Sequence, residues 1–234
     1  MTEENTIGVY GSHNFFQLFH QWDDAKKMQL CMWINDAIHE GLKKKSIKEF
    51  ILKGYEAVDK YIEESNKVFN KESKRKITCE AGCNNCCHMH VNCTSPEAKI
   101  VLDKAKELGL KLDETRLKQQ FILGQGNDQY DKMDASLRQC VFLIDGKCSV
   151  YDVRPFACRL LQSVTERSIC SSILYPNEMS EYVVCRQAEI LATVAQSAII
   201  VKYGEAHGQS FHNFLYKWTK DGLPDDPGGV PKCP

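Results

Sequence analysis

The residues with the clearest chemical role in this sequence are cysteines. Cys79, Cys83, Cys86 and Cys87 lie within nine residues of one another, in the pattern CxxxCxxCC. A thiolate is a metal ligand, and a bound metal keeps it deprotonated. The short spacers bring the sulfurs to one side of a tight turn, for which Gly82 supplies the backbone freedom. This segment therefore predicts a metal site.

The adjacent pair Cys86 and Cys87 calls for an explanation of its own. Neighbouring residues of an extended chain point in opposite directions. Without a special turn, both thiols are not expected to bind one centre. One of the two is expected to bind a second centre or to face a substrate.

A second block of cysteines follows some fifty residues later. Cys140 and Cys148 flank a predicted β-hairpin, and Cys158 comes shortly after Arg154. A hairpin that presents cysteines to a cysteine-rich loop is a common way to build a small metal domain. We expect Arg154 and Arg159 to offset the negative charge of the centre through charge-assisted hydrogen bonds to sulfur.

The number of cysteines bears on the type of metal. A structural zinc site takes four ligands, whereas seven to nine cysteines are candidates here. That number suits one iron–sulfur cluster with spare thiols, or two metal centres. An iron–sulfur cluster of the 4Fe-4S type is the prediction, and zinc is the alternative. The bacterial ferredoxin run of cysteines does not occur, so the prediction concerns the ligands and not that fold.

Two histidines follow the first cysteine group directly. His88 and His90 can ligate zinc or replace a cysteine on iron. The alternative is that they lie outside the coordination sphere or are exposed. Cys93 and Cys170 are left open between a ligand role and burial as small apolar side chains.

The bulk composition is that of an ordinary globular protein. The chain has 234 residues, of which 43% are hydrophobic and 26% charged, and its net charge is −1. Neither nucleic acid nor a membrane is expected as a partner, because there is no excess of positive charge and no apolar run of membrane-spanning length. Twelve cysteines and no apolar leader at the start indicate a cytoplasmic, metal-binding chain rather than a disulfide framework.

Helices are expected to position these cysteines. Ser46 and Glu49 form a capping box, and Ser95 before Pro96 is a helix start. Gly41 is expected to end the first helix. The predicted fold is mainly α, a helical domain with a small β-hairpin at 140–151, turning at Asp145-Gly146, as its only sheet. The expected helices span 24–40, 47–69, 95–108, 113–122, 183–203 and 209–220.

Three parts of the chain are expected. A helical N-terminal segment covers 1–76, the cysteine-cluster metal-binding domain covers 77–220, and 221–234 is a Pro/Gly-rich disordered tail.

The two cysteine blocks in this order resemble the YkgJ-like CxxCxxCC cysteine-cluster family. The resemblance covers roughly 77–190 and rests on CxxxCxxCC, on CVFL from Cys140, and on GKCSVYDVRPFACR from Gly146 to Arg159. It implies a zinc- or iron-chelating domain whose ligands are the seven matched cysteines, with Cys185 as a later candidate. A similar domain occurs in flagellin lysine methylase, which implies a metal-dependent role in protein modification. The metal candidates are Cys79, Cys83, Cys86, Cys87, Cys140, Cys148, Cys158 and Cys185.

Three functions remain open at this point. The first is a metalloprotein whose centre supports redox chemistry or modification of a protein substrate or partner. The second is an accessory module in which zinc is structural. The third is a metal chaperone. No catalytic residue is assigned, since no Walker loop, dinucleotide fingerprint or hydrolase triad occurs.

Overall fold

The computed structural model describes residues 7–8, 23–43, 46–123, 127–166, 170, 181–203 and 209–221. Within these ranges helices dominate and every strand has two residues, which confirms the mainly α prediction. The helices are α2 (Asp24–Asp36), the π-helix η1 (Ala37–Leu42), α3 (Ile47–Glu72), the 3-10 turn η2 (Asn85–His88), α4 (Ser95–Glu107), α5 (Glu114–Leu123), α6 (Asn127–Asp131), α7 (Ala135–Arg138), the 3-10 turn η3 (Tyr151–Val153), α8 (Phe156–Leu160), α9 (Arg186–Tyr203) and α10 (Phe211–Asp221).

The strands form short antiparallel ladders that fasten loops to one another. The hairpin predicted at 140–151 is present as β3 (Leu143–Ile144) and β4 (Lys147–Cys148). Its two turn residues both have positive φ, 50° at Asp145 and 73° at Gly146, as a two-residue hairpin turn requires. The described residues also form the ladders β1–β6–β5 (Ile7–Gly8, Tyr182–Val183, Gln162–Ser163) and β2–β7 (Asn92–Cys93, Gln209–Ser210). The expectation of a single sheet was therefore wrong, because isolated two-residue ladders leave no alternating pattern in the sequence.

The longest helix, α3, begins where its capping box predicts. Ser46 accepts a hydrogen bond from the Glu49 amide, and the Glu49 carboxylate accepts one from the Ser46 amide. The buried residues Ile51, Tyr55 and Val58 then follow at helical spacing. One face of α3 is therefore committed to the interior.

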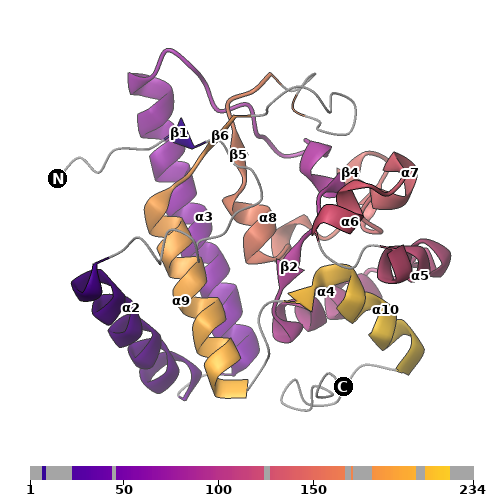
Figure 1. The fold of residues 1–234 in the computed structure, drawn as a ribbon, viewed down its shortest axis with the longest axis horizontal. Helices are drawn as coiled ribbons and strands as arrows, with labels where there is room; N and C mark the ends of the chain where they lie inside the picture. Colours follow the sequence, from indigo (N-terminus) through magenta and orange to yellow (C-terminus); the bar gives the residue numbers. More distant parts are fainter. Residues whose placement is uncertain are drawn as a thin grey trace.

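A first hydrophobic core joins α3 to α9. Figure 1 shows the two helices side by side, with α2 on the outer side of α9. The face of α9 is built from small residues, including Ala188, Ala192 and Ala195, so the larger side chains of α3 can pack closely against it. Phe156 from α8 completes this core, which therefore holds the segment that follows Arg154.

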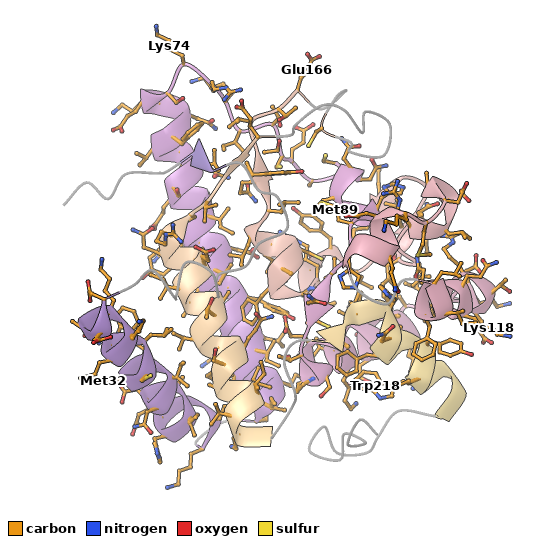
Figure 2. All side chains as sticks on the ribbon, in the orientation of Figure 1. Met32, Lys74, Met89, Lys118, Glu166 and Trp218 are labelled. Carbon is orange, nitrogen blue, oxygen red and sulfur yellow. The ribbon has the colours of Figure 1, made fainter. Side chains whose placement is uncertain are left out.

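A second core lies on the other side of the molecule, among α4, α5, α10 and the hairpin. Leu117, Phe142, Phe214 and Trp218 belong to it. Trp218 is buried on α10, whereas Met32 lies on the outward side of α2 (Figure 2). The region of α8 and the cysteine loop lies between the two cores (Figure 1).

Several helix ends differ from their predictions. Helix α9 begins at Arg186 rather than at 183, and α10 begins at Phe211 rather than at 209, because Gln209 and Ser210 form β7. Gly41 does not end a helix, because the chain continues as η1 to Leu42. A Cβ at Gly41 would lie 2.5 Å from a ring carbon of Phe50, so a larger residue there would force that ring to shift. The cap of α4 is Thr94 rather than Ser95, in a capping box with Glu97.

The predicted boundary near residue 76 stays a prediction. The first core contains residues from both sides of it, for example Val58 and Ile199. The predicted tail lies outside the described residues from 222 onward. No helix within the described ranges has the length and apolarity that crossing a bilayer requires.

Candidate metal centre

The first cysteine group lies on a loop that is fastened at its start. The amide of Thr78 donates to the Ser163 carbonyl at 2.8 Å, and the Ser163 amide donates to the Cys79 sulfur at 3.0 Å. The chain then turns at Gly82, whose φ of 91° is the positive value expected from the sequence. The amide of Cys83 closes this turn by donating to the Glu80 carbonyl.

Cys86 and Cys87 lie in the 3-10 turn η2, which is the special turn that an adjacent pair needs. Their side chains are hydrogen-bonded to each other. Adjacent thiols can therefore face one region here, unlike in an extended chain.

The hairpin brings the second block of cysteines to this loop. The Cys140 amide donates to the Cys87 carbonyl at 2.8 Å, and the Asn84 amide group donates to the Gly146 carbonyl at 3.2 Å. These two bonds, at the base and at the tip of the hairpin, fix Cys140 and Cys148 relative to η2.

Cys158 is positioned by a buried carboxylate. Glu97 is fully buried and accepts a hydrogen bond from the Phe156 amide at 2.9 Å, so it satisfies a free donor at the start of α8. The same carboxylate accepts from Thr94 and from Gln196 of α9. One side chain thus links α4, α8 and α9 around the turn that carries Cys158.

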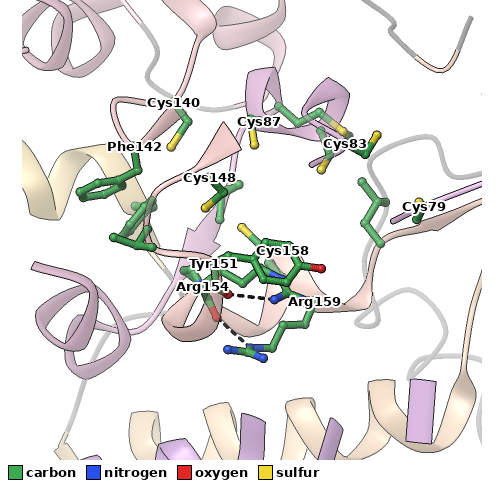
Figure 3. Close-up of a pocket in the computed structure, with 18 of the residues that line it drawn as sticks. Cys79, Cys83, Cys87, Cys140, Phe142, Cys148, Tyr151, Arg154, Cys158 and Arg159 are labelled. Carbon is green, nitrogen blue, oxygen red and sulfur yellow. Dashed lines mark hydrogen bonds between the residues drawn. The ribbon is translucent and has the colours of Figure 1, made fainter. Parts of the chain in front are cut away.

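These segments enclose a cavity of about 750 Å³ that lies between the two cores. Figure 3 shows Cys87, Cys140, Cys148 and Cys158 around one opening, while Cys79 lies apart from them. No group of three His, Cys, Asp or Glu side chains in the described ranges is arranged to hold a metal ion. The thiols thus line a cavity rather than a finished metal cage. Seven cysteines line it: Cys79, Cys83, Cys86, Cys87, Cys140, Cys148 and Cys158.

Burial raises the pKa of four of these thiols, those of Cys79, Cys140, Cys148 and Cys158. It raises the pKa of Cys79 and of Cys140 to about 12, against the lowering effect of amide hydrogen bonds from Ser163 and Phe142. Burial also raises the pKa of Cys158 well above its ordinary value, and the nearby thiols of Cys86, Cys140 and Cys148 add to the effect. Metal binding must therefore displace protons.

Backbone amides are aimed at several sulfurs. Besides the bond from Ser163 to Cys79, the Phe142 amide donates to Cys140 and the Val150 amide to Cys148. An anionic sulfur is a better acceptor than a neutral thiol. The donor set therefore fits metal-bound thiolates.

The two arginines lie at the cavity with different partners. Arg154 lies over the Tyr151 ring at 3.7 Å and donates to the Tyr151 carbonyl. Its charge lowers the pKa of Cys148, although burial dominates and the net shift is upward. Arg159 is almost fully buried, and the hydrogen bonds described for it go to Asp59 and to backbone carbonyls. Arg154 thus acts on the thiols through its charge, and no hydrogen bond from either arginine to sulfur occurs among those described.

Cys185 is not brought to the cavity. It is buried in the first core, where its thiol donates to the Tyr61 carbonyl at 3.4 Å. Cys93 is buried in the second core, and Cys31 is exposed on α2. Cys170 is half-buried and lies close enough to Cys79 to help raise the pKa of that thiol.

The sequence alone does not identify the other residues that line the cavity. Asp59 and Asn66 reach it from α3, and Tyr130 and His212 reach it from α6 and α10. No local spacing links these residues to the cysteines, because the tertiary packing alone brings them there.

Residues 78–183 match the family model of CxxCxxCC, described as a putative zinc- or iron-chelating domain. This segment is similar to the CxxCxxCC family. The seven cavity cysteines all lie within it, whereas Cys185 lies two residues beyond it. The match supports metal binding by this part of the chain. No curated protein and no solved structure matches the chain.

Proposed function

We propose that the cavity of the CxxCxxCC domain holds an iron–sulfur cluster of the 4Fe-4S type, and that the protein uses it for redox chemistry or for protein modification. The observation that carries the proposal is the lining of one cavity of about 750 Å³ by seven thiols from three separate segments. Four of these thiols would hold such a cluster, and the other three would lie beside it in the same cavity.

The residues that would hold the cluster are those that surround the opening. Three of these thiols are neighbours, those of Cys140, Cys148 and Cys158. The nearby Cys86 thiol raises the pKa of each of them. One thiol of the Cys86–Cys87 pair would be the fourth ligand. Such a cluster supplies one-electron chemistry.

The chain's own residues support a bound anion of this type. Amide donors stabilise thiolate sulfur, and the Arg154 guanidinium is placed to offset negative charge without occupying a ligand position. The second thiol of the adjacent pair would remain beside the centre, where it can contact a substrate.

The proposed partner is a protein. Met89 and Tyr151 line the cavity and are more than a third exposed, so apolar surface is available at its mouth. Nucleic acid is not proposed, since the net charge is −1. The proposed location is the cytoplasm, where reducing conditions keep such thiols free.

The test is anaerobic purification, followed by an absorption spectrum and assays for iron, acid-labile sulfide and zinc. A brown protein with about four irons and four sulfides per chain is expected. A colourless protein with tightly held zinc and no sulfide would instead support a structural zinc module. Metal that passes rapidly to a chelator would support a chaperone.

Cysteine variants locate the centre within the chain. Cys158→Ser and Cys140→Ser are expected to lose most of the bound metal, because each removes a thiol at the opening. Cys185→Ser and Cys31→Ser are the matched controls and should keep it, since neither residue lines the cavity. Full metal content in both cavity variants would refute the proposed ligand set.

A further inference from the structure

The antiparallel pairing of β2 with β7 is followed by one more backbone hydrogen bond, near the cavity. Asn92 pairs with Ser210, and Cys93 with Gln209. One step further, the Phe211 amide donates to the Val91 carbonyl at 2.8 Å. This bond lies next to His90, which precedes Val91, and to His212, the second residue of α10.

Both histidines line the cavity. The ladder and the bond from Phe211 to Val91 bring the start of α10 to the end of the cysteine loop, where these two residues lie. His212 lies outside the segment that matches the CxxCxxCC family.

The distance between the two rings suits a shared metal ion. Their centroids are 5.2 Å apart and their planes differ by 70°. With metal–nitrogen bonds of about 2.1 Å, and with a nitrogen about 1.2 Å from its ring centre, two imidazoles on one tetrahedral ion have centres about 5.4 Å apart. The observed spacing of the rings is thus compatible with one shared ion.

Tyr130 forms the third side of this cluster. Its ring lies 5.3 Å from His90 and 5.1 Å from His212. Its hydroxyl donates to the Arg138 carbonyl at 2.6 Å, so the phenol is a wall that orients the two imidazoles and not a ligand. His212 is only 6% exposed, which restricts its ring to few orientations.

We infer that His90 and His212 bind one divalent transition-metal ion of the zinc type at the cavity wall, separate from the thiol centre. Imidazole nitrogen is a preferred ligand for such ions. Two protein ligands leave coordination positions open to water or to a substrate in the cavity. The inference holds whichever metal the thiols bind.

The experiment is a cobalt titration of the full chain as purified, with its thiol centre loaded. One equivalent of Co²⁺ is expected to bind and to give visible ligand-field absorption, without the strong near-ultraviolet band of thiolate–cobalt charge transfer. His212→Phe and His90→Phe keep a flat ring but remove the nitrogen ligands, and should weaken binding at least tenfold. His39→Phe is the matched control, because His39 is exposed on η1.

Metal at the thiol centre is assayed separately in each variant, so failure of this inference is distinguishable from failure of the proposed function. Cobalt affinity that is unchanged in both cavity variants would show that the rings are only packing. Loss of the thiol-centre metal in the variants would make the histidines part of that centre and refute a separate site. If the variants unfold, long-range ¹H–¹⁵N spectra of the wild-type protein test the inference instead. Added zinc is expected to change the chemical shifts of the ring nitrogens of His90 and His212. Unchanged shifts would overturn the inference.

Discussion

At the scale of single residues, the two arginines at the cavity have different roles. Arg159 is 2% exposed and lies over the Tyr55 ring at 4.1 Å. It donates to the carbonyls of Asp152 and Arg154, which are the residues that lead into α8. Its main role is therefore to hold the backbone before Cys158.

Replacing Arg159 with Met should destabilise the protein by about 2–4 kcal/mol, because two backbone carbonyls lose their buried donor. Asp59→Asn is the matched control, and should cost less, since the amide oxygen can still accept from Arg159 and both carbonyl contacts remain. Urea unfolding of the two variants measures both free energies. Equal losses of unfolding free energy would mean that the ion pair with Asp59, and not the two carbonyl contacts, accounts for the stability that Arg159 provides.

The cavity also shows which residues a sequence can and cannot bring together. The seven cysteines that line it were all candidates from the sequence, because their spacing and number are a local signal, and their role as ligands stays a prediction. His212 was not, since it is more than a hundred residues from the cysteine loop and meets His90 only through the β2–β7 ladder. Cys185 was a candidate by position, but α9 turns it into the first core.

At the scale of elements, one carboxylate connects several helices. Glu97 caps α4 and accepts hydrogen bonds from α8 and α9, and its oxygen lies 3.5 Å from the Tyr55 hydroxyl of α3. Buried charge of this type is tolerated only when its hydrogen bonds are satisfied. Glu97 is therefore a positioning residue for the segment that carries Cys158.

The Glu97→Gln variant tests this role. The amide keeps the shape but turns a donor toward neighbours that are themselves donors, so a loss of about 2–4 kcal/mol is expected. Glu107→Gln, at an exposed pair with Lys104 on the same helix, should stay within about 0.5 kcal/mol of the wild type. Thermal and urea unfolding give the comparison, and a Glu97→Gln protein as stable as the control would rule out the connecting role.

Element prediction succeeded where the signal is local. The capping box at Ser46 and the Asp145-Gly146 turn are short patterns with a direct geometric cause, and the structure confirms both. Gly41 was misjudged because its small size serves the approach of Phe50, a contact that only the tertiary structure defines.

At the scale of the whole molecule, the cavity lies between two cores that come from different parts of the chain. The family-matched segment supplies the cysteines, but α3 supplies one wall and much of the first core. Helix α9 presents mainly small residues toward α3. Without α3, this apolar face of α9 would be exposed to water.

This arrangement gives a prediction about removal of residues 1–76, the expected N-terminal segment. The shortened chain loses Ile51, Tyr55 and Val58, whose complete burial would each contribute about 1.5–3 kcal/mol. That sum is comparable to the whole stability of a typical domain, about 5–15 kcal/mol, so the remainder should not unfold cooperatively and should lose its metal. Removal of 222–234 is the matched control, and should leave both properties unchanged. Circular dichroism melting curves and metal assays on the two shortened proteins distinguish the cases. A cooperative, metal-loaded 77–234 fragment would establish the boundary near residue 76 as that of an independent domain, because the cysteine cavity would then need no wall from α3.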